Sequence, residues 1–276
     1  MTKPTNALTR RTLLALAAAA TAAACGGKRA ATPHGRASTH TGRAVTSPTA
    51  APATAPQRTT TPTHGGRPGR RGPAREIAHG SRRQGDVALT FHTAGDPAIV
   101  NAVLRAARQA HAGLTMFVVG TWLEANPQFA DRIIRLGHDL GNHTWSHPVL
   151  PDDDAVMTHE EVVRCRNLLV RLTGNGGQWF RPSGTPQATP LILRAAGRAG
   201  YPTSLSYDVD PFDYTNPGAS LVTQRVLDEV RPGSIISLHT LYAGTAQALP
   251  AILHGLKQRG LRPVTARTLL GAQVAA

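Results

Sequence analysis

The chain has 276 residues, enough for one large domain or two small ones. Its formal net charge is +14, but residues 1–84 hold 14 Lys and Arg against the single acid Glu76, whereas residues 85–276 hold 16 basic and 15 acidic side chains. The excess charge therefore belongs to an N-terminal segment, and the rest of the chain lacks the basic excess expected of a nucleic-acid groove. No apolar run reaches the ~18 residues that suggest a membrane-spanning helix, which argues against a membrane channel.

Residues 1–25 have the pattern of an export signal. Arg10 and Arg11 precede an apolar stretch, 13–24, which has the length of the hydrophobic region of a signal peptide. The paired arginines resemble a Tat signal, and the small residues before Cys25 resemble a bacterial lipobox, in which the cysteine is lipidated. We expect an exported lipoprotein, anchored through Cys25 to the outer face of the cell membrane. Ordinary signal-peptidase cleavage, which would give a freely secreted protein, is the alternative.

Residues 26–84 are predicted to form a disordered linker. Ala, Thr, Pro, Gly and Arg dominate this segment, and large apolar side chains are almost absent. Such a composition cannot bury enough apolar surface to offset the entropy of ordering, and its Thr/Pro/Ala runs favour an extended spacer. The positive charge would favour anionic wall polymers or lipid headgroups. A linker without any specific partner is the alternative.

Strand and helix patterns alternate through residues 85–276, the predicted folded domain. Short apolar runs predict strands, and helical periodicity bounded by Pro, Gly or capping residues predicts helices. In chain order we expect a strand at 87–91, a helix at 97–113, a strand at 115–119, a helix at 126–137, a strand at 139–142, a helix at 158–172 with Thr158 and Glu161 as a capping box, a strand at 179–181, a helix at 189–199, a strand at 203–207, a helix at 220–230, a strand at 234–238, a helix at 246–259 and a strand at 262–264. Such repeated units imply an α/β fold with a parallel sheet, and about seven of them favour a (β/α) barrel over an open doubly wound sheet.

Polar side chains follow the predicted strands at their C-terminal ends. In parallel α/β folds these ends meet at one face, where functional residues gather. One histidine or carboxylate at such a place is weak evidence, but five clusters at the same end of the strands are hard to explain by surface polarity. The residues concerned are His92 and Asp96 after the first strand, the segment 142–147 after the third, Arg181 after the next, Asp208, Asp210 and Asp213 after another, and His239.

The spacing of His143 and His147 predicts a metal site. Two histidines four residues apart can direct both imidazoles to one point, and neutral imidazoles are preferred ligands of zinc and neighbouring divalent metals. A third ligand, ideally a carboxylate, would leave positions open for water and substrate, as hydrolysis requires. Two unrelated surface histidines are the alternative.

The ordered set of motifs resembles the polysaccharide deacetylases, the carbohydrate esterases with a NodB homology domain, over nearly all of residues 85–275. The resemblance implies a distorted (β/α) barrel of about seven parallel strands. It also implies the removal of N- or O-acetyl groups from sugars with one divalent metal ion, for which we expect zinc. The stretches that carry it are 87–91, 115–120, 137–148, 180–182, 209–214 and 231–239.

The resemblance also implies roles for individual residues. His143 and His147 would bind the metal, and His239 would be the general acid for the departing amine. Arg181 and Asp213 would orient and tune the catalytic base. These residues match the family's motifs at their own positions in this sequence.

The expected substrate is an acetylated polysaccharide, either peptidoglycan or a chitin-like glycan. Tyr214 would line the acetyl pocket, and Trp145 is assigned to the substrate pocket with it. We expect a monomer whose other partner is the membrane, reached through the lipid anchor, and we expect no nucleic-acid partner.

The first motif departs from the family. Where the family has two aspartates, a general base and a metal ligand, this sequence has His92 and Thr93, and Asp96 follows after Gly95. A glycine can bend the loop and return a carboxylate to the strand end, so we expect Asp96 to be the third metal ligand and His92 the catalytic base. The alternative has Asp96 as base, with His92 bonding the loop or joining the metal.

Two function classes follow from these departures. The first is an active metal-dependent deacetylase with a rearranged first loop. The second is a catalytically impaired, wall-binding lipoprotein on a deacetylase scaffold. Retention of His143, His147, Arg181, Asp213 and His239 favours the first class, because a pure binding protein has little need of a general acid.

Overall fold

The computed structural model describes residues 72–274, with side chains to Gly271. The predicted signal segment 1–25, including Cys25, and most of the predicted linker lie outside the described residues. Within them, no helix combines the length and the apolar character that crossing a bilayer requires.

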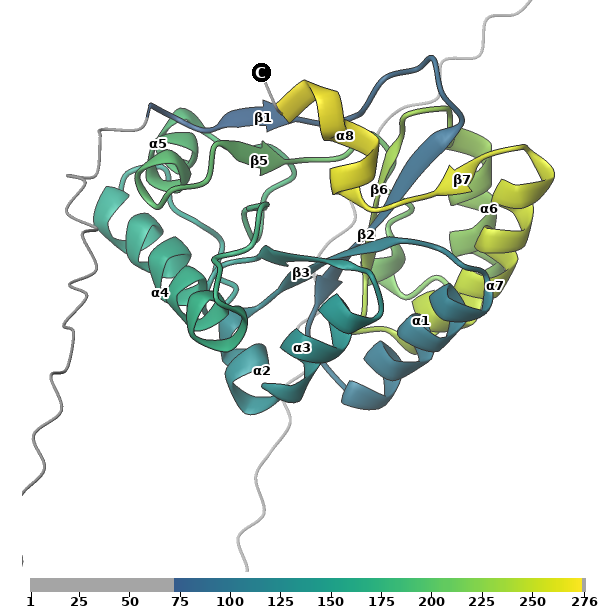
Figure 1. The fold of residues 1–276 in the computed structure, drawn as a ribbon, viewed down its shortest axis with the longest axis horizontal. Coiled ribbons are helices and arrows are strands. Elements are labelled where there is room, and N and C mark those ends of the chain that lie inside the picture. The colour runs from purple at the N-terminus through teal and green to yellow at the C-terminus, as the bar shows by residue number, and fades with distance from the viewer. Residues whose placement is uncertain (1–71, 275–276) are drawn as a thin grey trace, which may run out of the picture. The chain divides into compact units, whose positions relative to one another are not determined.

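The larger sheet is built around β2 (Asp86–Thr93). β2 pairs with β3 (Leu114–Val118), β6 (Ile235–His239) and β7 (Arg262–Pro263), and β3 pairs in turn with β4 (Asp139–Asn142). Every one of these pairings is parallel, so the C-terminal ends of the strands lie on one side (Figure 1). The register places His92 of β2 directly opposite His239 of β6.

A second, two-stranded sheet pairs β1 (Arg75–Ile77) with β5 (Thr203–Leu205), again in parallel. Single parallel bridges from Phe180 to Asn142 and to Ser204 connect this sheet to β4. The α/β fold with seven parallel strands is therefore confirmed. The predicted barrel is not closed in the described residues: the two sheets are linked only by isolated bridges, and residues 179–181, predicted as a strand, contribute only the bridges at Phe180.

Helices flank the strands, with α1, α6 and α7 along one side and α4 and α5 along the other (Figure 1). The starts of α1, α4 and α5 follow from local capping: the side chains of Asp96, Asp154 and Thr189 accept hydrogen bonds from backbone N–H groups of the first turns of these helices. The helices are α1 (Pro97–Gln109), α2 (Gly120–Ala125), α3 (Gln128–Arg135), α4 (Ala155–Thr173), α5 (Pro190–Arg198), α6 (Ala219–Glu229), α7 (Ala243–Gln258) and α8 (Ala266–Val274), with a 3₁₀ turn η1 (Asp213–Thr215).

The start of α4 differs from the prediction. The helix begins at Ala155 because the Asp154 carboxylate accepts hydrogen bonds from the N–H groups of Val156 and Met157. Thr158 is therefore buried inside the helix and caps nothing, which frees Glu161 for a different contact, described below. The helices α2 and α8 were not expected from the sequence.

The folded domain starts earlier than the composition predicts. Residues 75–77, assigned to the linker, form β1, and the Ala74 N–H donates to the carbonyl of Leu193 in α5 at 2.8 Å. Ala74 and Ile77 are buried although the surrounding sequence is polar. The burial of these two apolar side chains, together with the backbone pairing of β1, makes this short segment part of the domain.

A substitution at Gly197 in α5 tests whether the folded domain begins before residue 75. A Cβ at this position would collide with the Gly72 carbonyl, so Gly197→Ala should lower the free energy of unfolding by about 1–3 kcal/mol. Gly271→Ala in α8 is the matched control, because nothing lies within 4 Å of its added Cβ, and it should stabilise by up to ~1 kcal/mol. Denaturant unfolding measures both. Equal stabilisation by the two changes would show that residues 72–74 do not pack on α5.

Candidate metal centre

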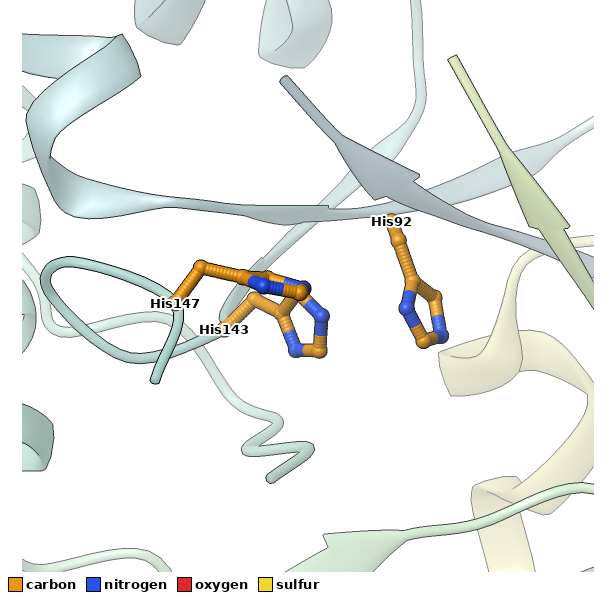
Figure 2. Close-up of side chains that lie close together, drawn as sticks. All are labelled: His92, His143 and His147. Carbon is orange, nitrogen blue, oxygen red and sulfur yellow. The ribbon is translucent and has the colours of Figure 1, made fainter. Parts of the chain in front are cut away.

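Three histidines form a cluster at the C-terminal ends of the strands. His92 lies near the end of β2, and His143 and His147 lie in the loop after β4. One ring nitrogen from each lies within 4.8 Å of the others. Figure 2 shows the rings of His143 and His147 side by side and His92 facing them from its strand. The sequence predicted two of these three as metal ligands.

His143 carries the strongest sign of a ligand role. It is fully buried, and its Nδ1 lies 3.0 Å from the Arg181 carbonyl, which can only accept, so Nδ1 carries the proton. Its Nε2 is buried and finds no hydrogen-bond partner within the described part of the chain. Burial, followed by the proximity of His147, lowers the pKa of His143 well below its usual value. A neutral imidazole with one nitrogen fixed by a carbonyl and the other unpaired suits a metal ion.

His92 is arranged similarly. The Ser237 hydroxyl, itself buried, lies 3.2 Å from His92 Nε2. This contact leaves Nδ1 available, and Figure 2 shows a His92 ring nitrogen on the side that faces the other two histidines. Burial, then the charges that His143 and His239 would carry, lower the pKa of His92 well below its usual value, so the ring is neutral.

The loop that carries His143 and His147 is held by two side chains. Asn142, fully buried, donates to the Val162 carbonyl at 2.8 Å and accepts from the Thr144 N–H at 2.8 Å. Glu161 of α4 accepts from the N–H groups of Trp145 and Ser146 at 2.9 and 2.8 Å, and from the Ser146 hydroxyl at 2.8 Å.

These contacts offset a strained backbone. Thr144 and His147 both have positive φ angles, 67° and 61°, a region that side chains other than glycine rarely adopt. The clamp by Glu161 holds the loop in this conformation between the two candidate ligands. Sequence reasoning missed this role, because a contact from α4 back to residue 145 leaves no local pattern.

His239 and Asp213 form a hydrogen-bonded pair beside the cluster. The Asp213 Oδ1 lies 2.7 Å from His239 Nδ1, and Oδ2 accepts from the His239 N–H at 2.8 Å and from the Thr245 hydroxyl at 2.6 Å. Asp213 is buried, so these bonds fix its carboxylate. The pair leaves His239 Nε2 for proton transfer, and the His239 ring centroid lies 4.2 Å from that of His92.

Arg181 gives its carbonyl to His143 of the cluster and its guanidinium to the strands. Its buried guanidinium donates to the Thr90 hydroxyl at 2.8 Å and to the carbonyls of Leu205 and Ser206 at 2.6 and 3.0 Å. Burial lowers the pKa of Arg181 to about 9. The guanidinium therefore links β2 to β5, and the Arg181 carbonyl orients His143. The positive charge of Arg181 is one of the factors that lower the pKa of His92.

A cavity of about 400 Å³ opens onto His92, His147 and His239. Tyr214, expected to line the acetyl pocket, is in its wall, and its ring centroid lies 5.4 Å from that of His239. Tyr242, which the sequence did not single out, lies 6.4 Å from His239 by the same measure. The lining comprises His92, His147, Gly184, Thr185, Pro186, Tyr207, Tyr214, His239, Leu241 and Tyr242.

The structure does not bring Asp96 into the cluster. Its side chain is exposed and caps α1, accepting from the Ala98 N–H at 2.7 Å. Within the described residues, the group able to hold a metal consists of the three histidines alone. The Asp96 carboxylate therefore acts in helix capping, and His92 occupies the third position that Asp96 was expected to fill.

Trp145 does not lie in the substrate pocket either. Its side chain is buried in the core, against Gly120 at the start of α2, with the Arg164 guanidinium 3.9 Å from its ring centroid. The Gly120 N–H donates to the Thr144 carbonyl at 2.9 Å, which docks this part of the loop on α2. The indole anchors the histidine-bearing loop and leaves the cavity to other residues.

The structure is an α/β fold with three histidines clustered at the C-terminal ends of its strands, and comparison with known proteins gives the family. The model of the family described as "Polysaccharide deacetylase" matches residues 79–204. A peptidoglycan-N-acetylglucosamine deacetylase of Bacillus cereus is 30% identical over 188 residues, which cover 67% of this chain and 87% of that protein. The chain therefore belongs to the polysaccharide deacetylase family.

Solved structures agree. A crystal structure of a peptidoglycan N-acetylglucosamine deacetylase is 28% identical, with a TM-score of 0.66, over 70% of this chain and 92% of that one. A CE4 family pseudoenzyme from Bacillus anthracis has the same TM-score of 0.66 at 23% identity, over 71% of this chain and 69% of that one. The second likeness bears on the fold alone.

Proposed function

We propose that this protein is a metal-dependent hydrolase that removes acetyl groups from an N- or O-acetylated polysaccharide, with peptidoglycan or a chitin-like glycan as substrate. The observation that carries the proposal is the cluster of three histidine nitrogens next to the His239–Asp213 pair. Family membership supports the reaction, and the peptidoglycan-directed name of the relative from Bacillus cereus supports the substrate class.

The residues present fit a metal ion. Three neutral imidazoles are a donor set that zinc favours, and the unpaired buried Nε2 of His143 is costly unless something binds it. Bound by His92, His143 and His147, a divalent ion would supply Lewis-acid polarisation of the acetyl carbonyl and activation of water. The fixed orientation of His143 by the Arg181 carbonyl prepares this site before the ion arrives.

The proton chemistry falls to His239. With His92 among the ligands, His239 is the imidazole beside the cluster that remains free to move a proton. Asp213 holds its Nδ1, so Nε2 can take a proton from the attacking water and deliver it to the departing sugar amine or hydroxyl. Tyr214 and Tyr242, on the cavity wall, would exclude bulk water around this transfer.

The alternative is a catalytically impaired wall-binding protein on this scaffold. Its support is that His92 and Thr93 stand where family members carry two aspartates, so no carboxylate belongs to the histidine cluster among the described residues. Acetate release from N-acetylglucosamine oligomers or peptidoglycan separates the two: the proposed hydrolase releases acetate after zinc loading, and the impaired protein binds glycan without releasing any.

Removing His92 should show whether His92 or Asp96 is the third metal ligand. His92→Ala should weaken zinc binding by more than about 100-fold, because one of three ligands is lost. Asp96→Ala is the matched control: it should keep zinc and lose about 0.5–2 kcal/mol of stability through the missing cap of α1. Competition with a chelator measures the affinity without reference to activity. Zinc loss in Asp96→Ala, with zinc retained in His92→Ala, would return the ligand role to Asp96.

Changes to the proton-transfer pair should lower turnover without loss of metal. His239→Ala and Asp213→Asn should each lower acetate release by about 10²–10⁴-fold while zinc content stays that of the parent. Asp228→Asn, at an exposed carboxylate of α6, should release acetate at the parent rate. Full activity in His239→Ala would exclude His239 as the proton carrier.

We propose that the protein is anchored to the membrane through Cys25. Lipidation at this residue predicts that Cys25→Ala moves the protein from the membrane fraction to the medium, whereas Cys165→Ala, at the buried second cysteine, does not. Fractions are washed at high salt, because the basic segment would otherwise hold the protein on anionic surfaces. Equal retention of parent and Cys25→Ala would support a freely secreted protein instead.

A further inference from the structure

Phe212 combines two features that ordinary packing does not favour. Its backbone lies in the left-handed region, with φ 53° and ψ 39°, and its side chain is 46% exposed. A bulky residue at positive φ is an outlier, since glycine or asparagine adopts this conformation at lower cost. The turn itself has a structural reason, because it directs Asp213 inward to His239, but that turn does not require an aromatic side chain.

The strained conformation is held by its neighbours. The Phe212 N–H donates to Asp210 Oδ1 at 2.9 Å, and its carbonyl accepts from the Thr215 hydroxyl at 2.8 Å. Arg225 of α6 donates to the Pro211 carbonyl at 2.9 Å and places its guanidinium 5.8 Å from the centre of the Phe212 ring. The ring is thus presented to solvent in a fixed position, and strain of this kind tends to persist at binding sites.

The ring continues an aromatic surface that leads out of the cavity. The Phe212 centroid lies 5.9 Å from that of Tyr214, which lies 5.4 Å from that of His239. Tyr214, which lines the cavity, is itself 43% exposed, so it and the neighbouring Phe212 form an exposed aromatic rim beside the cavity. A substrate whose acetyl group reaches His239 would place its next part over this rim if it is a polymer.

We infer that Phe212 is a glycan-binding residue, on which the apolar face of a neighbouring pyranose ring stacks when the acetylated sugar occupies the cavity. The inference rests on the proposed function and adds to it a contact for the sugar unit next to the acetylated one. An aromatic ring offers a pyranose a large rigid apolar surface at little cost in conformational entropy.

The test uses N-acetylglucosamine tetramer and monomer as probes. Binding is measured at equilibrium with the full chain in a His239→Ala background, so that the sugar is not consumed. Adding Phe212→Gly should weaken tetramer binding by about tenfold and leave monomer binding unchanged. Because glycine accepts positive φ, the thermal midpoint should not fall, whereas a purely structural phenylalanine would lower it when removed.

Two variants complete the test. Phe212→Trp should restore tetramer binding, and Ile134→Ala, at a similarly exposed apolar residue on α3, should leave it unchanged. Equal tetramer affinity with and without Phe212, or a loss that Phe212→Trp does not restore, would overturn the inference. Failure of the proposed hydrolysis is seen separately, as absence of acetate release from the parent chain, whatever the binding result.

Discussion

The unpaired Nε2 of the buried His143 imidazole is the constraint from which the chemistry of this protein follows. Burying a polar nitrogen without a partner costs free energy, and here the Arg181 carbonyl fixes the opposite nitrogen so that the ring cannot turn away. A metal ion shared with His92 and His147, as we propose, would offset that cost. Glu161 binds the loop that carries His143 and His147, and Trp145 packs against Gly120. Both contacts hold the histidines in place.

The centre combines His92, which the family resemblance does not lead one to expect as a ligand, with residues that fit the resemblance. His92 and Ser237 are 145 positions apart in the sequence, yet β2 and β6 pair so that the Ser237 hydroxyl contacts His92 Nε2. The His239–Asp213 pair, by contrast, fits the roles that the family resemblance implies. The third place in the cluster is thus held by an imidazole with its own supporting contact, beside a histidine–carboxylate pair suited to proton transfer.

Much of this could be predicted because the signals are local. The apolar run at 87–91 and Pro97 placed β2 and α1, and the C-terminal ends of parallel strands had to bring His92, His143 and His239 together. The wrong predictions share one cause: each side chain had more than one possible partner, and the structure gives it a partner other than the predicted one. Asp96 was predicted to be a metal ligand, but it directly precedes Pro97, and at this position its carboxylate caps the helix. Trp145 was read as pocket-lining, and Glu161 as a cap, because their true partners lie across the fold.

The central claim is the three-histidine metal site, and X-ray absorption spectroscopy of the zinc-loaded protein tests it most directly. Three imidazole ligands predict Zn–N distances of about 2.0–2.1 Å together with the outer-shell scattering of about three imidazole rings. His92→Ala should reduce the imidazole contribution by one ring. A spectrum with only two imidazoles, unchanged by removal of His92, would contradict the claim and place zinc on ligands other than this cluster.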